Sequence, residues 1–284
     1  MQPLDEVQLL LAEGTHELAS AGIEEAHLEA RLLLALAGKC TQVEVLAGHL
    51  RLDDGIVSRF RELIAARARR VPYAYLAGMQ EFYGLEFQVN QDVLVPRPET
   101  ELLVDLAVGA LRGLPNPVMV DVGTGSGCIV VACAVHVPML KALAVDVSPG
   151  AARVARNNVL RHGVEGRVVV VRGDLLSAVG SRCVDLVASN PPYVASDEIP
   201  NLQPEVRCFE PRVALDGGRA GMDYHERLAR HARKVLNPGG WLMVETAQGQ
   251  AHLVAELLNV CGYRQVQTHR DLAGIERVVC GRAD

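Results

Sequence analysis

From about residue 99 onward the chain alternates strand-like and helix-like segments, and this alternation limits the folds it can adopt. Strand-like apolar runs cover residues 117–122, 140–147, 167–171, 183–189 and 240–246, and helical periodicity covers residues 126–137, 149–162, 223–236 and 249–261. Such an order builds a mostly parallel sheet with helices on both faces. Two final strands, near 263–269 and 275–281, have no helix between them, which predicts one antiparallel strand. The predicted fold class is α/β, with a Rossmann-like sheet.

The first 72 residues predict a small helical domain. Leucine, isoleucine and phenylalanine residues recur there at three- and four-residue spacings, which is the pattern of short amphipathic helices. Thr41 and Glu44 have the form of a capping box and predict a helix start near residue 42. The run Arg67–Arg70 closes the last helix, where it either complements the helix dipole or contacts phosphate or an acidic partner. No catalytic motif occurs in this domain, so we interpret it as a substrate-recognition module.

A connector with a β-hairpin is expected to join the helical domain to the α/β domain. Met79–Tyr83 and Leu85–Val89 alternate apolar and polar residues on either side of a turn at Gly84. The predicted domain limits are 1–72 for the helical domain, 73–97 for the connector and 98–284 for the α/β domain.

Composition excludes several classes of protein. A net charge of −6 and a pI near 5.9 provide no broad basic surface for nucleic acid. Seven scattered cysteines without a Cys-x-x-Cys pair are typical of buried thiols in a reducing compartment, and no metal-ligand spacing is present. The first residues are acidic where a signal peptide is basic, and no apolar run approaches the ~18 residues of a membrane span. We expect a cytoplasmic protein without a membrane, metal or direct nucleic-acid partner.

The loop after the first predicted strand carries glycines that allow its backbone to approach a ligand closely. The cofactor-binding candidates in this loop are Gly123, Thr124, Gly125, Ser126 and Gly127. Their Gly-x-Gly-x-Gly spacing departs from the dinucleotide pattern Gly-x-Gly-x-x-Gly. Asp121, ahead of the loop, would repel a pyrophosphate but suits a ligand with a cationic amino group. These features favour S-adenosylmethionine over a nicotinamide or flavin dinucleotide.

Further candidates follow the next strands, because ligands of doubly wound sheets lie at the carboxyl ends of the strands. Asp146 follows the second strand, about twenty residues beyond the glycines, where a carboxylate can accept both ribose hydroxyls or simply cap a helix. After the third strand, Asp174 can accept a hydrogen bond from an adenine amino group and Leu175 can pack on the ring. The fourth strand ends in Asn190-Pro191-Pro192-Tyr193. Four successive strand ends therefore carry a candidate site residue.

The turn Asn190-Pro191-Pro192-Tyr193 presents hydrogen-bond acceptors in a stiff loop, since prolines have no N–H to donate. It suits a substrate with an –NH2 group, and Tyr193 adds a flat face for a planar amide or base. Asn-Pro-Pro also simply ends strands. We predict that Asn190, Pro191, Pro192 and Tyr193 bind the substrate and promote the reaction. Arg97, held extended between two prolines, is either a strap at the entry to the domain or a substrate-binding residue at the mouth of the site.

The chain resembles the HemK/PrmC protein-glutamine methyltransferases. The resemblance rests on four stretches: Glu81-Phe82-Tyr83-Gly84 followed by Pro96–Glu101, Asp121–Gly127, Ser189–Tyr193, and Glu210-Pro211 with the Gly217-Gly218 turn. It implies methyl transfer from S-adenosylmethionine to the glutamine side chain in the Gly-Gly-Gln loop of class I peptide chain release factors. It also implies that the N-terminal helices recognise the release factor, that Gly123–Gly127, Asp146 and Asn190 contact the cofactor, and that Asn190–Tyr193 hold the glutamine.

Alternative functions remain open from the sequence. A DNA methyltransferase acting on the exocyclic amino group of adenine would use the same turn on a flipped base, although the charge does not favour it. A non-enzymatic protein that retains the cofactor fold for docking is a second alternative, which the intact turn disfavours. The glycine spacing disfavours a nicotinamide dehydrogenase.

Overall fold

The computed structural model describes residues 3–284. Its contacts divide the chain into two compact units. The first unit ends at Gly78 and also contains Pro204–Phe209, and the second comprises Met79–Gln203 and Glu210–Asp284. The smaller unit is therefore discontinuous in sequence.

The first unit is helical, as its periodicity predicts. Its helices are α1 (Pro3–Ser20), α2 (Ala26–Gly38), α3 (Gln42–Leu46), α4 (Asp54–Ala68), α5 (Tyr73–Ala77) and α9 (Pro204–Phe209). The apolar positions Leu18, Leu33 and Phe60 are at most 1% exposed and form its core. The predicted capping box is confirmed: the Thr41 hydroxyl accepts from the Glu44 amide at 3.2 Å, and Glu44 Oε2 accepts from the Thr41 amide at 2.8 Å.

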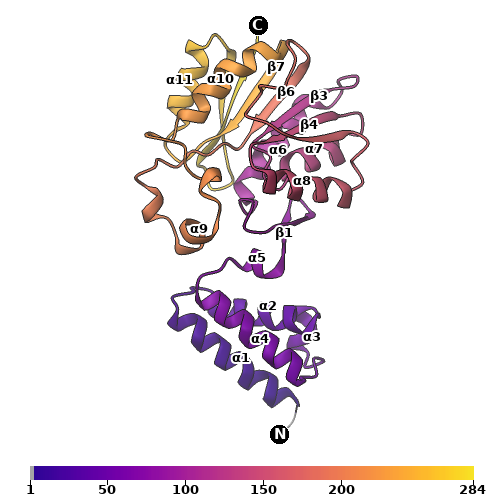
Figure 1. The fold of residues 1–284 in the computed structure, drawn as a ribbon, viewed down its shortest axis with the longest axis vertical. Coiled ribbons are helices and arrows are strands. Elements are labelled where there is room, and N and C mark those ends of the chain that lie inside the picture. The colour runs from indigo at the N-terminus through magenta and orange to yellow at the C-terminus, as the bar shows by residue number, and fades with distance from the viewer. Residues whose placement is uncertain (1–2) are drawn as a thin grey trace. The chain divides into compact units, whose positions relative to one another are not determined.

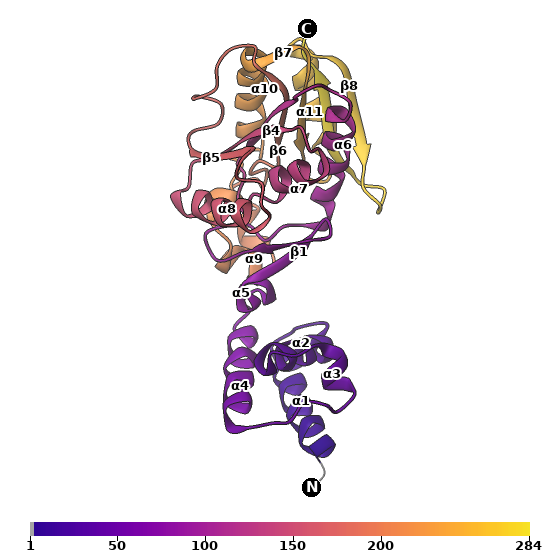
Figure 2. The same cartoon turned by 90° about the vertical axis from the view of Figure 1, so that its right-hand side faces the viewer.

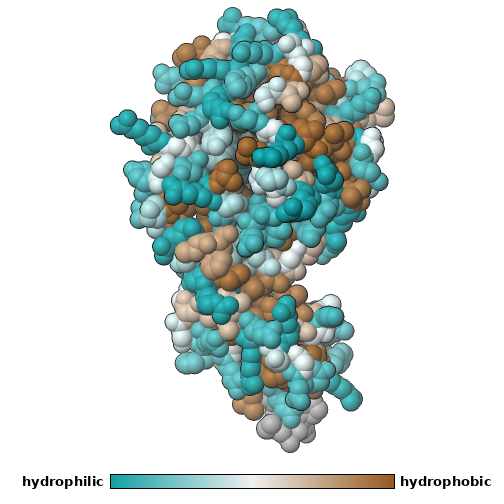
Figure 3. Space-filling view, in the orientation of Figure 1, coloured by the Kyte–Doolittle hydropathy of each residue, from teal (hydrophilic) through white to brown (hydrophobic). Residues whose placement is uncertain are grey.

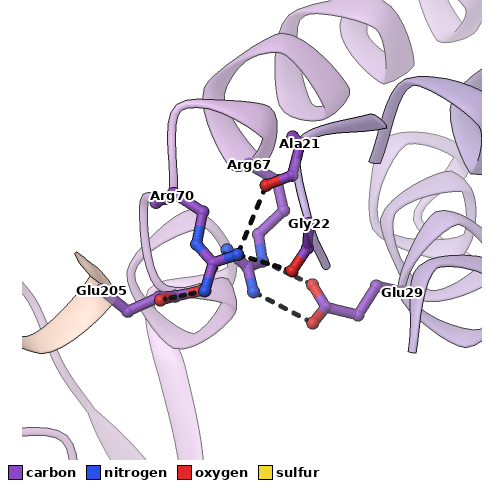
Figure 4. A network of polar contacts seen from close by, with 6 residues as sticks. All are labelled: Ala21, Gly22, Glu29, Arg67, Arg70 and Glu205. Atoms are coloured by element: carbon purple, nitrogen blue, oxygen red, sulfur yellow. Dashed lines mark hydrogen bonds and ion pairs between the residues drawn. The ribbon is translucent and has the colours of Figure 1, made fainter. Parts of the chain in front are cut away.

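Helix α9 joins the helical unit through two arginines of the Arg67–Arg70 run. Arg67, with a side chain only 7% exposed, forms ion pairs with Glu29 at 2.5 Å and Glu205 at 2.9 Å. Arg70 binds the other carboxylate oxygen of Glu205 at 2.7 Å and donates to the Gly22 carbonyl, as Figure 4 shows. Acidic side chains of the same unit thus pair with both cations.

Replacing Arg67 by methionine is expected to lower the free energy of unfolding of the helical unit by about 3 kcal/mol, because Glu29 and Glu205 then lose their shared cation in a largely buried place. Arg59→Met, on the same helix α4, is the matched control. Its pair with Glu62 is exposed, and its loss should change the free energy by about 0.5 kcal/mol or less. Urea unfolding followed by circular dichroism measures both, and equal shifts would contradict the assigned role of Arg67.

The second unit opens with the predicted hairpin. Strands β1 (Met79–Phe82) and β2 (Leu85–Gln88) pair antiparallel around Tyr83 and Gly84. Both turn residues have positive φ, 55° and 72°, which matches the twist of a two-residue hairpin loop. The hairpin prediction is confirmed.

A seven-stranded sheet forms the centre of the second unit. Its strands are β3 (Val118–Val122), β4 (Lys141–Asp146), β5 (Val168–Arg172), β6 (Val184–Ser189), β7 (Leu236–Glu245), β8 (Arg264–Arg270) and β9 (Glu276–Arg282). The strand order is β5-β4-β3-β6-β7-β9-β8, and β9 runs antiparallel to both of its neighbours. The mostly parallel sheet with one antiparallel strand is thus confirmed. Its order reverses between β3 and β6, where ligands of such sheets bind.

Helices cover both faces of this sheet, as Figures 1 and 2 show. The helices are α6 (Glu101–Leu111), α7 (Cys128–His136), α8 (Pro149–Arg161), α10 (Asp223–Val235) and α11 (Ala251–Val260). Met119 of β3 packs in the core with α6, α7 and α8, whereas the next residue, Val120, packs in the core with α10 and α11. Alternate residues of this buried strand therefore pack against the helices on opposite faces of the sheet.

The segment between β6 and α10 contains short helical turns. They are η2 (Ile199–Asn201), α9 and η3 (Arg212–Ala214). Figure 3 shows hydrophilic residues over much of the visible surface, with hydrophobic residues gathered on the right side of the larger unit. Within residues 3–284, no helix is both long and apolar enough to cross a membrane.

Candidate active site

One cavity lies where β3, β4, β5 and β6 end. It is bordered by most of the residues that the sequence singled out: Arg97, Gly123, Thr124, Gly125, Ser126, Asp146, Asp174, Leu175, Asn190, Pro191 and Pro192. Gly127 and Tyr193 are not among the described residues that line it. The fold thus gathers stretches that lie up to 95 residues apart into a single site.

The glycine loop forms one wall of the cavity with its backbone. Gly123 and Gly125 have φ of +70° and +56°, and a side-chain carbon added at Gly123 would meet no protein atom within 4 Å. A side chain there would extend into open space, so the glycine leaves room for a ligand. Gly127 serves packing instead, because a carbon added there would lie 3.3 Å from Ala155 of α8.

Buried polar atoms adjoin this loop. Asp121 is fully buried, accepts from the Thr124 hydroxyl at 2.6 Å, and has a second carboxylate oxygen without a partner. Burial raises the pKa of Asp121 to about 7. Ser126 also has a buried hydroxyl without a partner and lines the cavity. Asp121 does not line the cavity, and it supports the loop through its hydrogen bond with Thr124.

Asp146 is held in place by two backbone amides. Its carboxylate oxygens accept from Gly125 and from Ser148, each at 2.9 Å. Burial raises its pKa, and these hydrogen bonds lower it. Its position at the end of β4, beside the glycine loop, agrees with a ligand-binding carboxylate, and each oxygen retains a further lone pair.

Asp174 and Leu175 lie at the end of β5. Asp174 is exposed, and its Oδ2 forms an ion pair with Arg227 at 2.6 Å. Leu175 is buried in the left-handed conformation, with φ of 50°. Both residues border the cavity, but the carboxylate of Asp174 is already shared with an arginine.

The turn after β6 borders the same cavity as Asp146. Asn190 donates from Nδ2 to the Thr100 hydroxyl at 3.1 Å, and none of the described residues is a hydrogen-bond partner of its Oδ1. Pro191 and Pro192 border the cavity, whereas the Tyr193 hydroxyl donates to Glu245 Oε1 at 3.3 Å. Burial raises the pKa of the Tyr193 hydroxyl, and the Glu245 charge adds to this. The Tyr193 hydroxyl is therefore directed at Glu245.

Arg97 both lines the cavity and connects to the segment after β6. Its guanidinium lies 2.6 Å from Oε1 of Glu210, whose side chain is 1% exposed. Burial raises the pKa of Glu210, and the charge of Arg97 lowers it. Both positions that the sequence allowed for Arg97 are thus compatible with its location.

Sequence reasoning missed Thr100 and Glu245. Thr100 ends η1 (Pro98–Thr100), is 2% exposed and lines the cavity. Thr100 could have been found from the stretch Pro96–Glu101, which carries part of the family resemblance, but only Arg97 of that stretch was chosen as a site residue. Glu245 ends β7 and is 1% exposed, so the rule that drew attention to the other strand ends also points to it.

Comparisons with known proteins identify the families that the two parts of the chain match. A family model described as the PrmC N-terminal domain matches residues 10–78, and one described as the methyltransferase small domain matches residues 100–203. A solved methyltransferase from Pyrococcus furiosus, 20% identical, matches with a TM-score of 0.53 over 77% of this chain and 98% of that one, which supports the fold.

Close relatives extend the match to nearly the whole chain. The release factor glutamine methyltransferase of Geobacter sulfurreducens is 43% identical over 267 residues, which cover 93% of this chain and 92% of that protein. The enzyme of the same name from Caulobacter vibrioides is 38% identical over 265 residues, with the same shares covered. These identities confirm the resemblance read from the motifs, and the chain belongs to the release factor glutamine methyltransferase family.

Proposed function

We propose that this protein transfers a methyl group from S-adenosylmethionine to the side-chain amide nitrogen of the glutamine in the Gly-Gly-Gln loop of class I peptide chain release factors. The observation that carries the proposal is that the glycine loop and the Asn190 turn border the same cavity. Family membership supports the choice of substrate.

The residues around the cavity suit this cofactor. Gly123 and Gly125 leave space beside the backbone, and Asp146 supplies acceptors for ribose hydroxyls. Leu175 offers an apolar surface for the adenine ring, and Asp174, Thr124 and Ser126 complete the polar border. When bound, S-adenosylmethionine supplies an electrophilic methyl group on a positively charged sulfur.

An amide is a weak nucleophile because its nitrogen lone pair is delocalised into the carbonyl. The Asn190 turn compensates for this by orienting the amide. Asn190 Oδ1 and the Pro191 carbonyl accept hydrogen bonds from the two amide hydrogens of the glutamine and direct its nitrogen along the line of displacement. With the cofactor held by the glycine loop and Asp146, its methyl carbon would be transferred to this nitrogen, and the electron pair of the broken carbon–sulfur bond would stay on sulfur. Nitrogen then loses a proton to water or a carbonyl. Orientation of this kind contributes up to roughly 7–11 kcal/mol, so no strong base is required.

The other parts of the site have supporting roles in this proposal. Pro192 stiffens the turn, Tyr193 holds it through Glu245, and Arg97 contacts the substrate loop at the mouth of the cavity. The helical domain recognises the release factor in the cytoplasm. The net charge of −6 favours a protein partner over DNA.

Incubation of the purified protein with methyl-labelled S-adenosylmethionine and a class I release factor tests the proposal. We expect label on the release factor, and peptide mass spectrometry should place one methyl group on the glutamine of the Gly-Gly-Gln loop. A release factor with that glutamine replaced by alanine is the matched control and should stay unlabelled. Label on duplex DNA, or none on either substrate, would overturn the proposal.

A further inference from the structure

The proposed mechanism requires the Asn190 side-chain amide to face the cavity with Oδ1. The turn itself does not fix this orientation. The oxygen and nitrogen ends of a carboxamide have nearly the same size, so packing alone does not select which end faces the cavity. Only the groups that hydrogen-bond to Asn190 distinguish the two ends. If Nδ2 faced the cavity, it would oppose the N–H groups of an incoming amide.

Thr100 is the group that makes this distinction. Its side chain is buried, and its hydroxyl accepts from Asn190 Nδ2 at 3.1 Å. A hydroxyl can also donate, however, and in that state it would bind Asn190 Oδ1 and turn the amide around. Thr100 therefore selects the productive orientation only if its one hydrogen is engaged elsewhere.

Glu245 offers a buried acceptor for that hydrogen. Burial raises the pKa of its carboxyl to about 7, and hydrogen bonds from Thr100 and Tyr193 lower it. The Tyr193 hydroxyl donates to Oε1 at 3.3 Å, and the buried Oε2 has no hydrogen-bond partner among the described residues, so it is free to accept one. Above about pH 7 the Glu245 carboxylate is ionised and accepts only, so in that state it draws the hydroxyl hydrogens of both Thr100 and Tyr193 toward itself.

We propose, on the basis of the function proposed above, that Thr100 and Glu245 are positioning residues that hold the Asn190 amide with Oδ1 toward the substrate. In this arrangement Asn190 Nδ2 donates to the Thr100 hydroxyl, and that hydroxyl turns its own hydrogen toward the unpartnered Oε2 of Glu245. Tyr193 donates to the same carboxylate, so both ends of the Asn190–Tyr193 turn are held by Glu245.

Thr100→Val keeps the shape of the side chain and removes its hydroxyl. We expect the turnover number for release factor methylation to fall about 10-fold, as loss of one hydrogen bond in a desolvated site predicts, with the dissociation constant of S-adenosylmethionine changed less than about threefold. Thr100→Ser restores the hydroxyl and should return turnover to within about threefold of the wild type. If the valine variant does not fold, as judged by cofactor binding, Thr100→Ala replaces it.

A double-mutant cycle separates positioning from a general structural effect. In an Asn190→Ala background, Thr100→Val should cause no further loss of turnover, because the residue through which it acts is gone. Additive losses, or wild-type turnover of both Thr100→Val and Thr100→Ala, would overturn the inference.

A readout that needs no methyl transfer distinguishes this inference from the proposed function. The side-chain amide signals of Asn190, assigned by their disappearance in Asn190→Ala, are expected to shift in nuclear magnetic resonance spectra of Thr100→Val and Glu245→Gln but to stay close to the wild type in Thr100→Ser. Unmoved signals in the first two variants would refute the positioning role even in an active enzyme. If the wild type fails to methylate the release factor, the proposed function fails, while these spectra still decide the orientation of the amide.

Discussion

Asn190→Ala is expected to lower the turnover number for release factor methylation by about 10²–10³-fold, the loss that follows removal of one hydrogen-bonding group aligned with the reacting atoms. Alanine cannot accept from the substrate amide, so the glutamine nitrogen loses its alignment. Affinity for S-adenosylmethionine should change only a few-fold, because the glycine loop and Asp146 remain. Steady-state kinetics and isothermal titration calorimetry measure the two effects separately.

Asn157→Ala is the matched control for this prediction. Asn157 is an exposed asparagine on α8, outside the cavity, and its side chain donates to Gln88 at 3.2 Å. Its replacement should leave turnover unchanged. Wild-type turnover in Asn190→Ala would remove Asn190 from the mechanism, and a collapse of cofactor binding would make it primarily a cofactor residue.

Gly123→Ala is expected to weaken S-adenosylmethionine binding by roughly 10–100-fold, the range for one unaccommodated carbon in a shaped site. The protein itself has space for the methyl group, since no atom lies within 4 Å of its position. That space is the cavity, so the methyl group competes with the ligand. Calorimetric titration of the cofactor into the variant measures the loss.

Gly84→Ala separates this effect from backbone strain. Gly84 has φ of +72°, close to the +70° of Gly123, and also has open space around the added carbon, but it lies in the β1–β2 turn. Both variants should therefore lose a similar stability, about 1–2 kcal/mol for alanine in the left-handed conformation. Only Gly123→Ala should lose cofactor affinity, and equal affinities in the two variants would contradict the assignment of the glycine loop.

Much of the fold follows from local patterns in the sequence. The capping box at Thr41 and Glu44 and the hairpin at Tyr83-Gly84 depend on a few neighbouring residues, so they can be read directly. The parallel sheet follows from the alternation of segments, and its topology places the ends of β3 and β6 side by side. Gly123, Asp146 and Asn190 could be located for that reason.

Contacts between distant segments could not be predicted in the same way. The hydrogen bond of Asn190 to Thr100 joins residues 90 positions apart, and that of Tyr193 to Glu245 joins residues 52 apart. The hydrophobic periodicity of the sequence does not predict which distant side chains pair. The inward direction of the Tyr193 hydroxyl and the packing role of Gly127 depend equally on neighbours that only the folded chain supplies.

The discontinuity of the helical unit has a consequence for how the protein is made. Arg70 and Glu205 are separated by 135 positions, so the ribosome releases the first five helices long before it synthesises α9. Until then Arg67 and Arg70 lack the carboxylate that joins them, and the nascent unit is incomplete. A fragment cut after Gly78 would resemble that nascent state, so an excised helical unit keeps these ion pairs only with a graft of Pro204–Phe209.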